Sequence, residues 1–158
     1  MNLLQSDIFT FRNQDYTVDQ EQSFSGGVTS NWSAGNTVVC AQLYNPPSSG
    51  VTVLVDRVWF NVEQDGNVFL GRGTAAFFGS TANWQNKKLG SANGNARVQT
   101  EAFAAIPGTI IERFVIGALN GYDYEPIYPY MLEEGNSLIV THNTTTLPLH
   151  VNFYGREI

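Results

Sequence analysis

The chain has one cysteine and almost no lysine, and these shortages set the first limits on its function. Of its 158 residues, only Cys40 is cysteine and only Lys87 and Lys88 are lysine. One cysteine allows no intramolecular disulfide and no cysteine-based metal site, and its position in the apolar run 37–44 predicts a buried thiol. The net charge is −6, so the clustered basic residues that bind phosphates are missing, and we expect no nucleic-acid partner.

Long apolar runs are missing as well. No segment approaches the roughly 18 consecutive apolar residues that a membrane span requires, so we expect no membrane partner. The first nine residues, MNLLQSDIF, lack the positive flank of a signal peptide. Together with the low cysteine content, this predicts synthesis in a reducing cytoplasm.

Charged side chains make up only 14% of the chain, whereas asparagine and glycine each occur 15 times. Asparagine competes for backbone hydrogen bonds and glycine costs entropy, so long helices are disfavoured. Apolar segments instead recur at roughly ten-residue spacing between turn residues, a pattern typical of about eight strands. The sequence therefore predicts an all-β fold, an antiparallel β-sandwich, with a jelly roll as the preferred topology.

One long predicted strand, 51–63, carries two local signals. Its apolar phase changes at Asp56 and Arg57, which predicts a β-bulge at that point. The Asp65-Gly66 pair that follows predicts a two-residue hairpin turn into the next apolar run.

Other segments are predicted from their apolar pattern alone. Both faces of 109–119 are apolar, which predicts a strand buried between two layers. The last strand, 147–154, alternates strictly and predicts one buried face and one wet face. By contrast, 81–97 is rich in asparagine and glycine and predicts a long surface loop that carries Trp84.

The first 36 residues differ from the rest, because their aromatic residues are isolated and their periodicity is weak. We interpret 1–36 as an N-terminal arm and loop, with 23–36 as loop, and 37–158 as the sandwich domain. The arm could lie on a partner or on its own domain, and the sequence leaves both alternatives open. Its apolar anchors would be Leu3, Leu4, Ile8, Phe9 and Phe11.

No arrangement of residues predicts catalysis. Nucleophilic catalysis needs a serine or cysteine beside an oriented histidine, and a Gly-x-Ser-x-Gly motif is absent. His142 and His150 flank a short turn and are predicted to lie on the solvent face. Two histidines alone are too few to hold a metal. Glu112 is the most notable carboxylate, because it lies in an apolar run, but Arg113 beside it should face the opposite way. We therefore predict no enzyme, no metal and no cofactor.

The remaining candidates for binding are aromatic. Four tyrosines occur between 122 and 130, with two prolines among them. Such a segment suits protein contacts or sugar stacking, and partial burial at one end of the sandwich is the simpler alternative. Besides the anchors of the arm, the candidate interaction residues are these four tyrosines and two tryptophans: Trp32, Trp84, Tyr122, Tyr124, Tyr128 and Tyr130.

Two segments resemble small structural proteins of tailed-bacteriophage virions, of the capsid decoration (cement) or head-fibre type. The first, CAQLYNPPSSGVTVLVDRVWFNV (40–62), matches a hairpin of two strands around an Asn-Pro-x-x-Ser-Gly loop. The second, PYMLEEGNSLIVTHNTTTLPLHVNFYGREI (129–158), matches an acidic-Gly turn and a last strand ending in aromatic-x-Arg-Glu. The resemblance implies a jelly-roll-like sandwich in a capsid or tail, often a trimer, without catalytic residues.

The predicted function is that of a non-enzymatic phage virion structural protein. The specific expectation is a capsid decoration (cement) protein, a homotrimer, whose partners are the major capsid protein or other virion proteins. It would be located in the virion after synthesis in the host cytoplasm. The alternative is a carbohydrate- or receptor-binding module of a phage fibre or spike, which would use Trp32, Trp84 and the tyrosine segment; a hydrolase is the remote third class.

Overall fold

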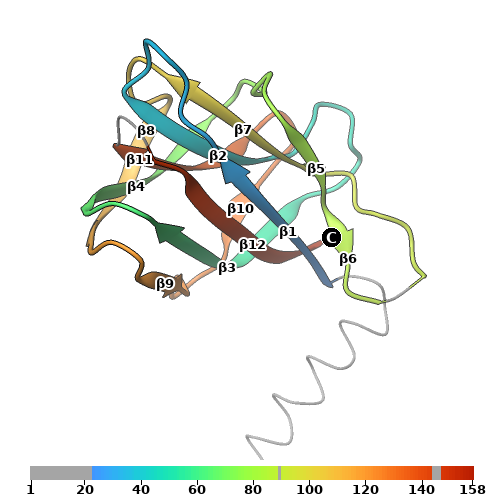
Figure 1. Ribbon diagram of the computed structural model, residues 1–158. Coiled ribbons are helices and arrows are strands. Elements are labelled where there is room, and N and C mark those ends of the chain that lie inside the picture. The colour runs from blue at the N-terminus through green and yellow to red at the C-terminus, as the bar shows by residue number, and fades with distance from the viewer. Residues whose placement is uncertain (1–22, 89, 144–146) are drawn as a thin grey trace, which may run out of the picture.

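The computed structural model describes residues 23–88, 90–143 and 147–158, and these residues form strands and no helix (Figure 1). The strands build two six-stranded antiparallel sheets that pack against each other. The predicted all-β sandwich is thereby confirmed, whereas the jelly-roll topology stays a prediction.

Sheet A has the order β10-β3-β12-β1-β6, with β9 also paired to β3, and sheet B has the order β5-β7-β2-β11-β4-β8. The strands of sheet A are β1 (Ser23–Ser30), β3 (Val53–Val62), β6 (Gln85–Asn86), β9 (Gly121–Tyr124), β10 (Tyr130–Leu132) and β12 (Leu149–Glu157). Those of sheet B are β2 (Val38–Tyr44), β4 (Gly66–Gly73), β5 (Thr81–Asn83), β7 (Arg97–Phe103), β8 (Thr109–Ile116) and β11 (Ser137–Asn143).

The alternation of the last strand builds the core as predicted. Leu149, Val151 and Phe153 of β12 point between the sheets and are almost fully buried. Their neighbours His150 and Asn152 lie on the outer face of sheet A and are half-buried. Burial of each large apolar side chain contributes about 1.5–3 kcal/mol, so this one face of β12 is a major source of stability.

The predicted bulge in β3 is also confirmed. Tyr154 of β12 pairs with Arg57, and the next residue, Gly155, pairs with Val55, so Asp56 is the extra residue. A Cβ atom on Gly155 would collide with the backbone carbonyl oxygen of Leu54. Glycine is therefore required where the two strands close up beside the bulge.

Both hairpin predictions are wrong, because the chain changes sheets at each turn. β3 belongs to sheet A and β4 to sheet B, so the Asp65-Gly66 turn joins strands that do not pair. The 40–62 segment likewise connects β2 of sheet B to β3 of sheet A. A turn signal specifies only that the chain reverses, whereas burial of the inner faces decides which strand receives it.

Of the described strands, β2 and most of β11 are buried on both faces, and the expectation that 109–119 would be such a strand is wrong. All seven residues of β2 are buried. Segment 74–80 covers the outer face of sheet B, where Phe77 packs with Val38 and Cys40. β8, by contrast, pairs only with β4 and is the edge strand of sheet B, with most of its residues exposed.

Buried glutamines hold segment 74–80 in place. Gln42 Nε2 donates to the carbonyl oxygen of Ala75 at 2.8 Å, and Gln42 Oε1 accepts from the Phe77 N–H at 2.9 Å. Gln99 Nε2 donates to the carbonyl oxygen of Phe77 at 2.9 Å. These side chains bond the backbone groups that a neighbouring strand would otherwise bond. The backbone of segment 74–80 can therefore lie on a buried face without unsatisfied polar groups.

Two loop predictions are wrong in part, although 31–36 and 90–96 do lie outside the strands. The expected loop 23–36 contains β1, which pairs with β12 along its whole length. The expected surface loop 81–97 contains β5 and β6, which join the two sheets, and Trp84 between them is fully buried. Residues 1–22, with the five predicted anchors of the arm, lie outside the described part of the structure.

The buried thiol of Cys40 gives a direct test of this packing. Burial raises the pKa of Cys40 from 9.0 to about 12, because the thiolate cannot be solvated. We expect no reaction of the native protein with Ellman's reagent at pH 8, and reaction of one thiol per chain once denaturant unfolds it. Since the unfolded thiol ionises near 9, the free energy of unfolding should fall as the pH rises from about 9 towards 12. Rapid labelling of the native protein would contradict the covered outer face of sheet B.

Candidate functional site

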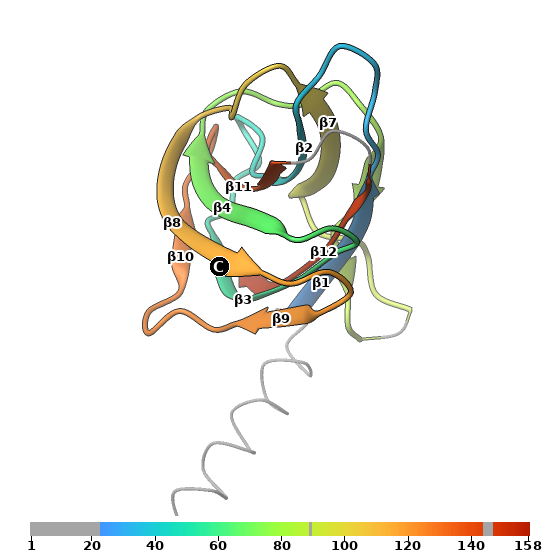
Figure 2. The same cartoon turned by 60° about the vertical axis from the view of Figure 1, so that its left-hand side comes forward.

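The edges of the two sheets meet along one side of the sandwich. β8 forms this edge of sheet B, and β9 and β10 form that of sheet A (Figure 2). β5 and β6 close the opposite side (Figure 1). We call residues 109–132 the β8–β10 margin.

Glu112 joins the two sheets at this margin. Its Oε1 atom accepts hydrogen bonds from the hydroxyls of Tyr124 and Tyr130, both at 2.6 Å. Burial, followed by the hydrogen bond to the Glu112 carboxylate, raises the pKa of both tyrosines, so both hydroxyls stay protonated and donate. Arg113 faces the other way, as predicted, and its Nε atom donates to Asn67 Oδ1 at 2.9 Å.

Aromatic side chains also connect the two sheets at this margin. The ring of Phe114 on β8 lies 5.0 Å from that of Tyr124 and 5.2 Å from that of Tyr122, measured between centroids. Phe60 of β3 stacks on Tyr122 at 5.4 Å. Tyr124 and Tyr130 are therefore partly buried, as the simpler alternative for this segment proposed, whereas Tyr128 is 82% exposed.

The outward side of the margin is strongly apolar. Among the described residues, eight of the eleven large hydrophobic side chains that are exposed belong to it. They are Ile110, Ile111, Val115, Leu119, Tyr122, Ile127, Tyr128 and Met131. Exposed apolar side chains that gather at one edge of a protein are a feature of contact surfaces.

The two predicted tryptophans divide between surface and core. Trp32 is 37% exposed, and its Nε1 atom donates to the carbonyl oxygen of Asn36 at 2.9 Å. Trp84 is fully buried and stacks on Phe24, so its prediction as an interaction residue is wrong. The carbohydrate- or receptor-binding alternative therefore loses one of its two expected tryptophans.

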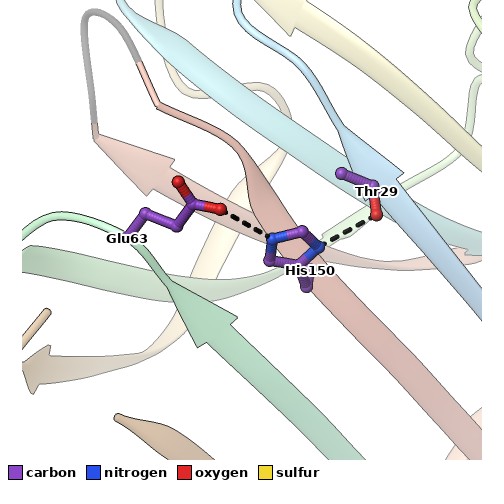
Figure 3. Close-up of polar contacts among 3 residues, drawn as sticks. All are labelled: Thr29, Glu63 and His150. Atoms are coloured by element: carbon purple, nitrogen blue, oxygen red, sulfur yellow. Dashed lines mark hydrogen bonds and ion pairs between the residues drawn. The ribbon is translucent and has the colours of Figure 1, made fainter. Parts of the chain in front are cut away.

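The two histidines also differ from each other. His142 points between the sheets and is fully buried, contrary to the predicted solvent face, and burial lowers its pKa. His150 does lie on the outer face of sheet A. Its Nδ1 atom is 2.9 Å from Thr29 Oγ1, and its Nε2 atom is 3.2 Å from Glu63 Oε1 (Figure 3).

The Thr29–His150–Glu63 chain has the connectivity of a nucleophile, a base and an orienting acid. An acyl-transfer site also needs donors aimed at a developing oxyanion. β12 is paired on both sides, so its backbone N–H groups near His150 are taken up by the ladders. The arrangement therefore fixes the imidazole, and the hydroxyl of Thr29 keeps further hydrogen-bonding capacity for a ligand. Sequence reasoning missed it, because Thr29 and His150 are 121 positions apart.

Two further properties of the described residues bear on the site. No three His, Cys, Asp or Glu side chains in them are grouped so that they could hold a metal ion. Nor do they contain a helix with the length and apolar character needed to cross a membrane. The chain matches no protein-family model, no curated protein and no solved structure.

Proposed function

We propose that the protein is a non-enzymatic structural component of a bacteriophage virion, a capsid decoration (cement) protein that assembles through its β8–β10 margin. The observation that carries the proposal is the exposed apolar surface of this margin. Its role in the protein is contact with another protein, because such a surface in water is stabilised by being covered. The resemblance of 129–158 to virion proteins is the reason for placing this contact in a virion.

The strand order supports the jelly-roll part of this proposal. Eight strands divide into β1-β12-β3-β9 in sheet A and β2-β11-β4-β8 in sheet B. Successive strands of this set mostly alternate between the sheets, and β5, β6 and β7 are inserted between β4 and β8. Jelly rolls with eight strands in two sheets are common among viral capsid proteins and lectins.

We propose a second copy of this chain as the occupant of the margin. A standard protein interface buries about 800 Å² on each partner, and the exposed apolar side chains of the margin would form part of such an interface. Each chain carries −6, and the margin contains three carboxylates. Glu112 accepts hydrogen bonds from two tyrosines and Asp123 lies 3.5 Å from Arg57, whereas the exposed Glu125 must stay outside the contact. In a three-fold symmetric trimer, the margin of each subunit contacts a different surface of the next subunit.

Charges placed in the margin test this assembly. Val115 and Ile127 are 83% and 93% exposed, so the double variant Val115→Asp/Ile127→Asp should fold with a thermal midpoint close to that of the wild type. Light scattering should give about three times 17.4 kDa for the wild type and one chain mass for the variant. Phe78→Asp, at a 92% exposed position outside the margin, is the matched control and should remain a trimer.

Binding to shells tests the virion setting separately. Wild-type protein should rebind phage capsids from which the decoration protein has been stripped, and it should raise their resistance to heat. A protein that stays monomeric at high concentration would reject the second copy as the occupant. Failure to rebind stripped capsids would reject the cement function.

A further inference from the structure

The two outer faces of the sandwich differ in a way that points to a ligand site. Segment 74–80 covers that of sheet B, whereas on sheet A the described residues leave the outward side chains of β3, β12 and β1 half-buried or exposed. These positions carry polar and aromatic residues in two neighbouring rows. One row is Trp59, Asn152 and Gly27, and the other is Asn61, His150 and Thr29.

A shallow groove of about 470 Å³ lies across these rows, between β3, β12 and β1. Trp59 lines one side, and its indole is held beside the backbone of Gly121 on β9. Gly27 leaves the opposite side without a side chain, and the amide oxygen of Asn152 occupies the space that a Cβ there would need. We call this the Trp59 groove.

The polar groups of the groove are held in place before any ligand binds. Hydrogen bonds to Thr29 and Glu63 fix both nitrogens of His150 (Figure 3). A group that is already oriented loses less entropy when it binds a ligand. The amide of Asn152 adds a donor and an acceptor on the same side.

None of the residues that line the groove is an aspartate, glutamate, lysine or arginine. An ionic ligand would find no uncompensated partner among these groups, whereas a neutral ligand with many hydroxyls would find both donors and acceptors. A half-buried indole suits the apolar CH face of a sugar ring, since tryptophan combines a large apolar surface with a polar edge.

We propose that the Trp59 groove binds a neutral saccharide. The sugar ring stacks on the indole of Trp59, and its hydroxyls bond to the side chains of Asn152 and Thr29, both of which line the groove. The groove is open, so affinity for one saccharide unit is weak, on the order of millimolar. This site adjoins the β8–β10 margin through β9 but has its own lining residues, and it does not depend on the proposed virion function.

Nuclear magnetic resonance on the full chain tests the proposal. The probes are hexasaccharides of glucose, mannose, galactose and N-acetylglucosamine at about 10 mM, a concentration above the expected dissociation constant, with sialylated and sulphated oligosaccharides for comparison. The chain has three tryptophans and so three indole N–H signals. At least one neutral probe should shift that of Trp59, while those of Trp32 and the buried Trp84 stay in place.

Substitutions in the groove separate binding from folding. Trp59→Ala should weaken binding about tenfold, and Trp59→Phe, which keeps an aromatic face, should restore most of it. Asn152→Ala removes one polar contact from the outer face, and should weaken binding severalfold without changing the thermal midpoint. Val115→Asp/Ile127→Asp should bind the saccharide as the wild type does, whatever its oligomeric state.

Three results would overturn the proposal. In the first, none of the neutral probes shifts the Trp59 signal. In the second, Trp59→Ala and Asn152→Ala bind as tightly as the wild type. In the third, sialylated or sulphated probes bind better than neutral ones, which would mean that the Trp59 groove prefers anionic ligands.

Discussion

Trp84→Ala should lower the free energy of unfolding by about 3–5 kcal/mol, the cost typical of removing a large buried aromatic side chain. Trp84 is fully buried between the sheets, and its ring stacks on Phe24 with centroids 6.0 Å apart. Gly26 and Gly94 carry no Cβ where the indole passes, so other side chains cannot easily fill the cavity. The thermal midpoint should fall by roughly 10 °C, measured by circular dichroism.

Two variants control this experiment. Trp84→Phe keeps an aromatic ring in the same space and should lose clearly less stability than Trp84→Ala. Trp32→Ala, at a 37% exposed position, should change stability by less than about 1 kcal/mol. If Trp84→Ala were as stable as the wild type, Trp84 would lie on a surface loop after all, as the sequence alone suggests.

Gln42→Leu should destabilise the protein by about 2–4 kcal/mol although it keeps the side-chain volume. Leucine cannot replace the hydrogen bonds of Gln42 to Ala75 and Phe77, and the Phe77 N–H would be left buried without a partner. An unsatisfied buried backbone group costs about 1–3 kcal/mol. Amide hydrogen exchange should show the effect directly, with lost protection at Phe77 well before the strands of the sandwich open.

The same substitution at an exposed strand position is the matched control. Gln85→Leu on β6 does not touch segment 74–80 and should change the free energy of unfolding by no more than about 0.5 kcal/mol. A protected Phe77 amide in Gln42→Leu would contradict the role of Gln42 in holding segment 74–80.

The candidate site was only partly predictable. The composition of the tyrosine-rich segment predicts a binding surface there. For three of its neighbours in the margin, Ile110, Ile111 and Val115, the apolar pattern predicts burial. Their exposure follows from the place of β8 at the edge of sheet B, which no local pattern encodes. The Trp59 groove was not predictable, because strands from three distant parts of the chain form it.

What the sequence determined by itself is the local structure. Strict alternation in 147–154 and the phase change at Asp56 predict a strand and a bulge, and the structure has both. These features depend on the period of two of a strand and on backbone constraints, which act between neighbouring residues.

Only the tertiary structure decided which strands pair and which faces are covered. Apolar residues on both faces of a strand can indicate burial between layers, as in β2, or an exposed edge that a partner would cover, as in β8. The difference depends on whether other segments, such as 74–80, reach the second face. That is a property of packing between residues far apart in sequence, and a local pattern carries no information about it.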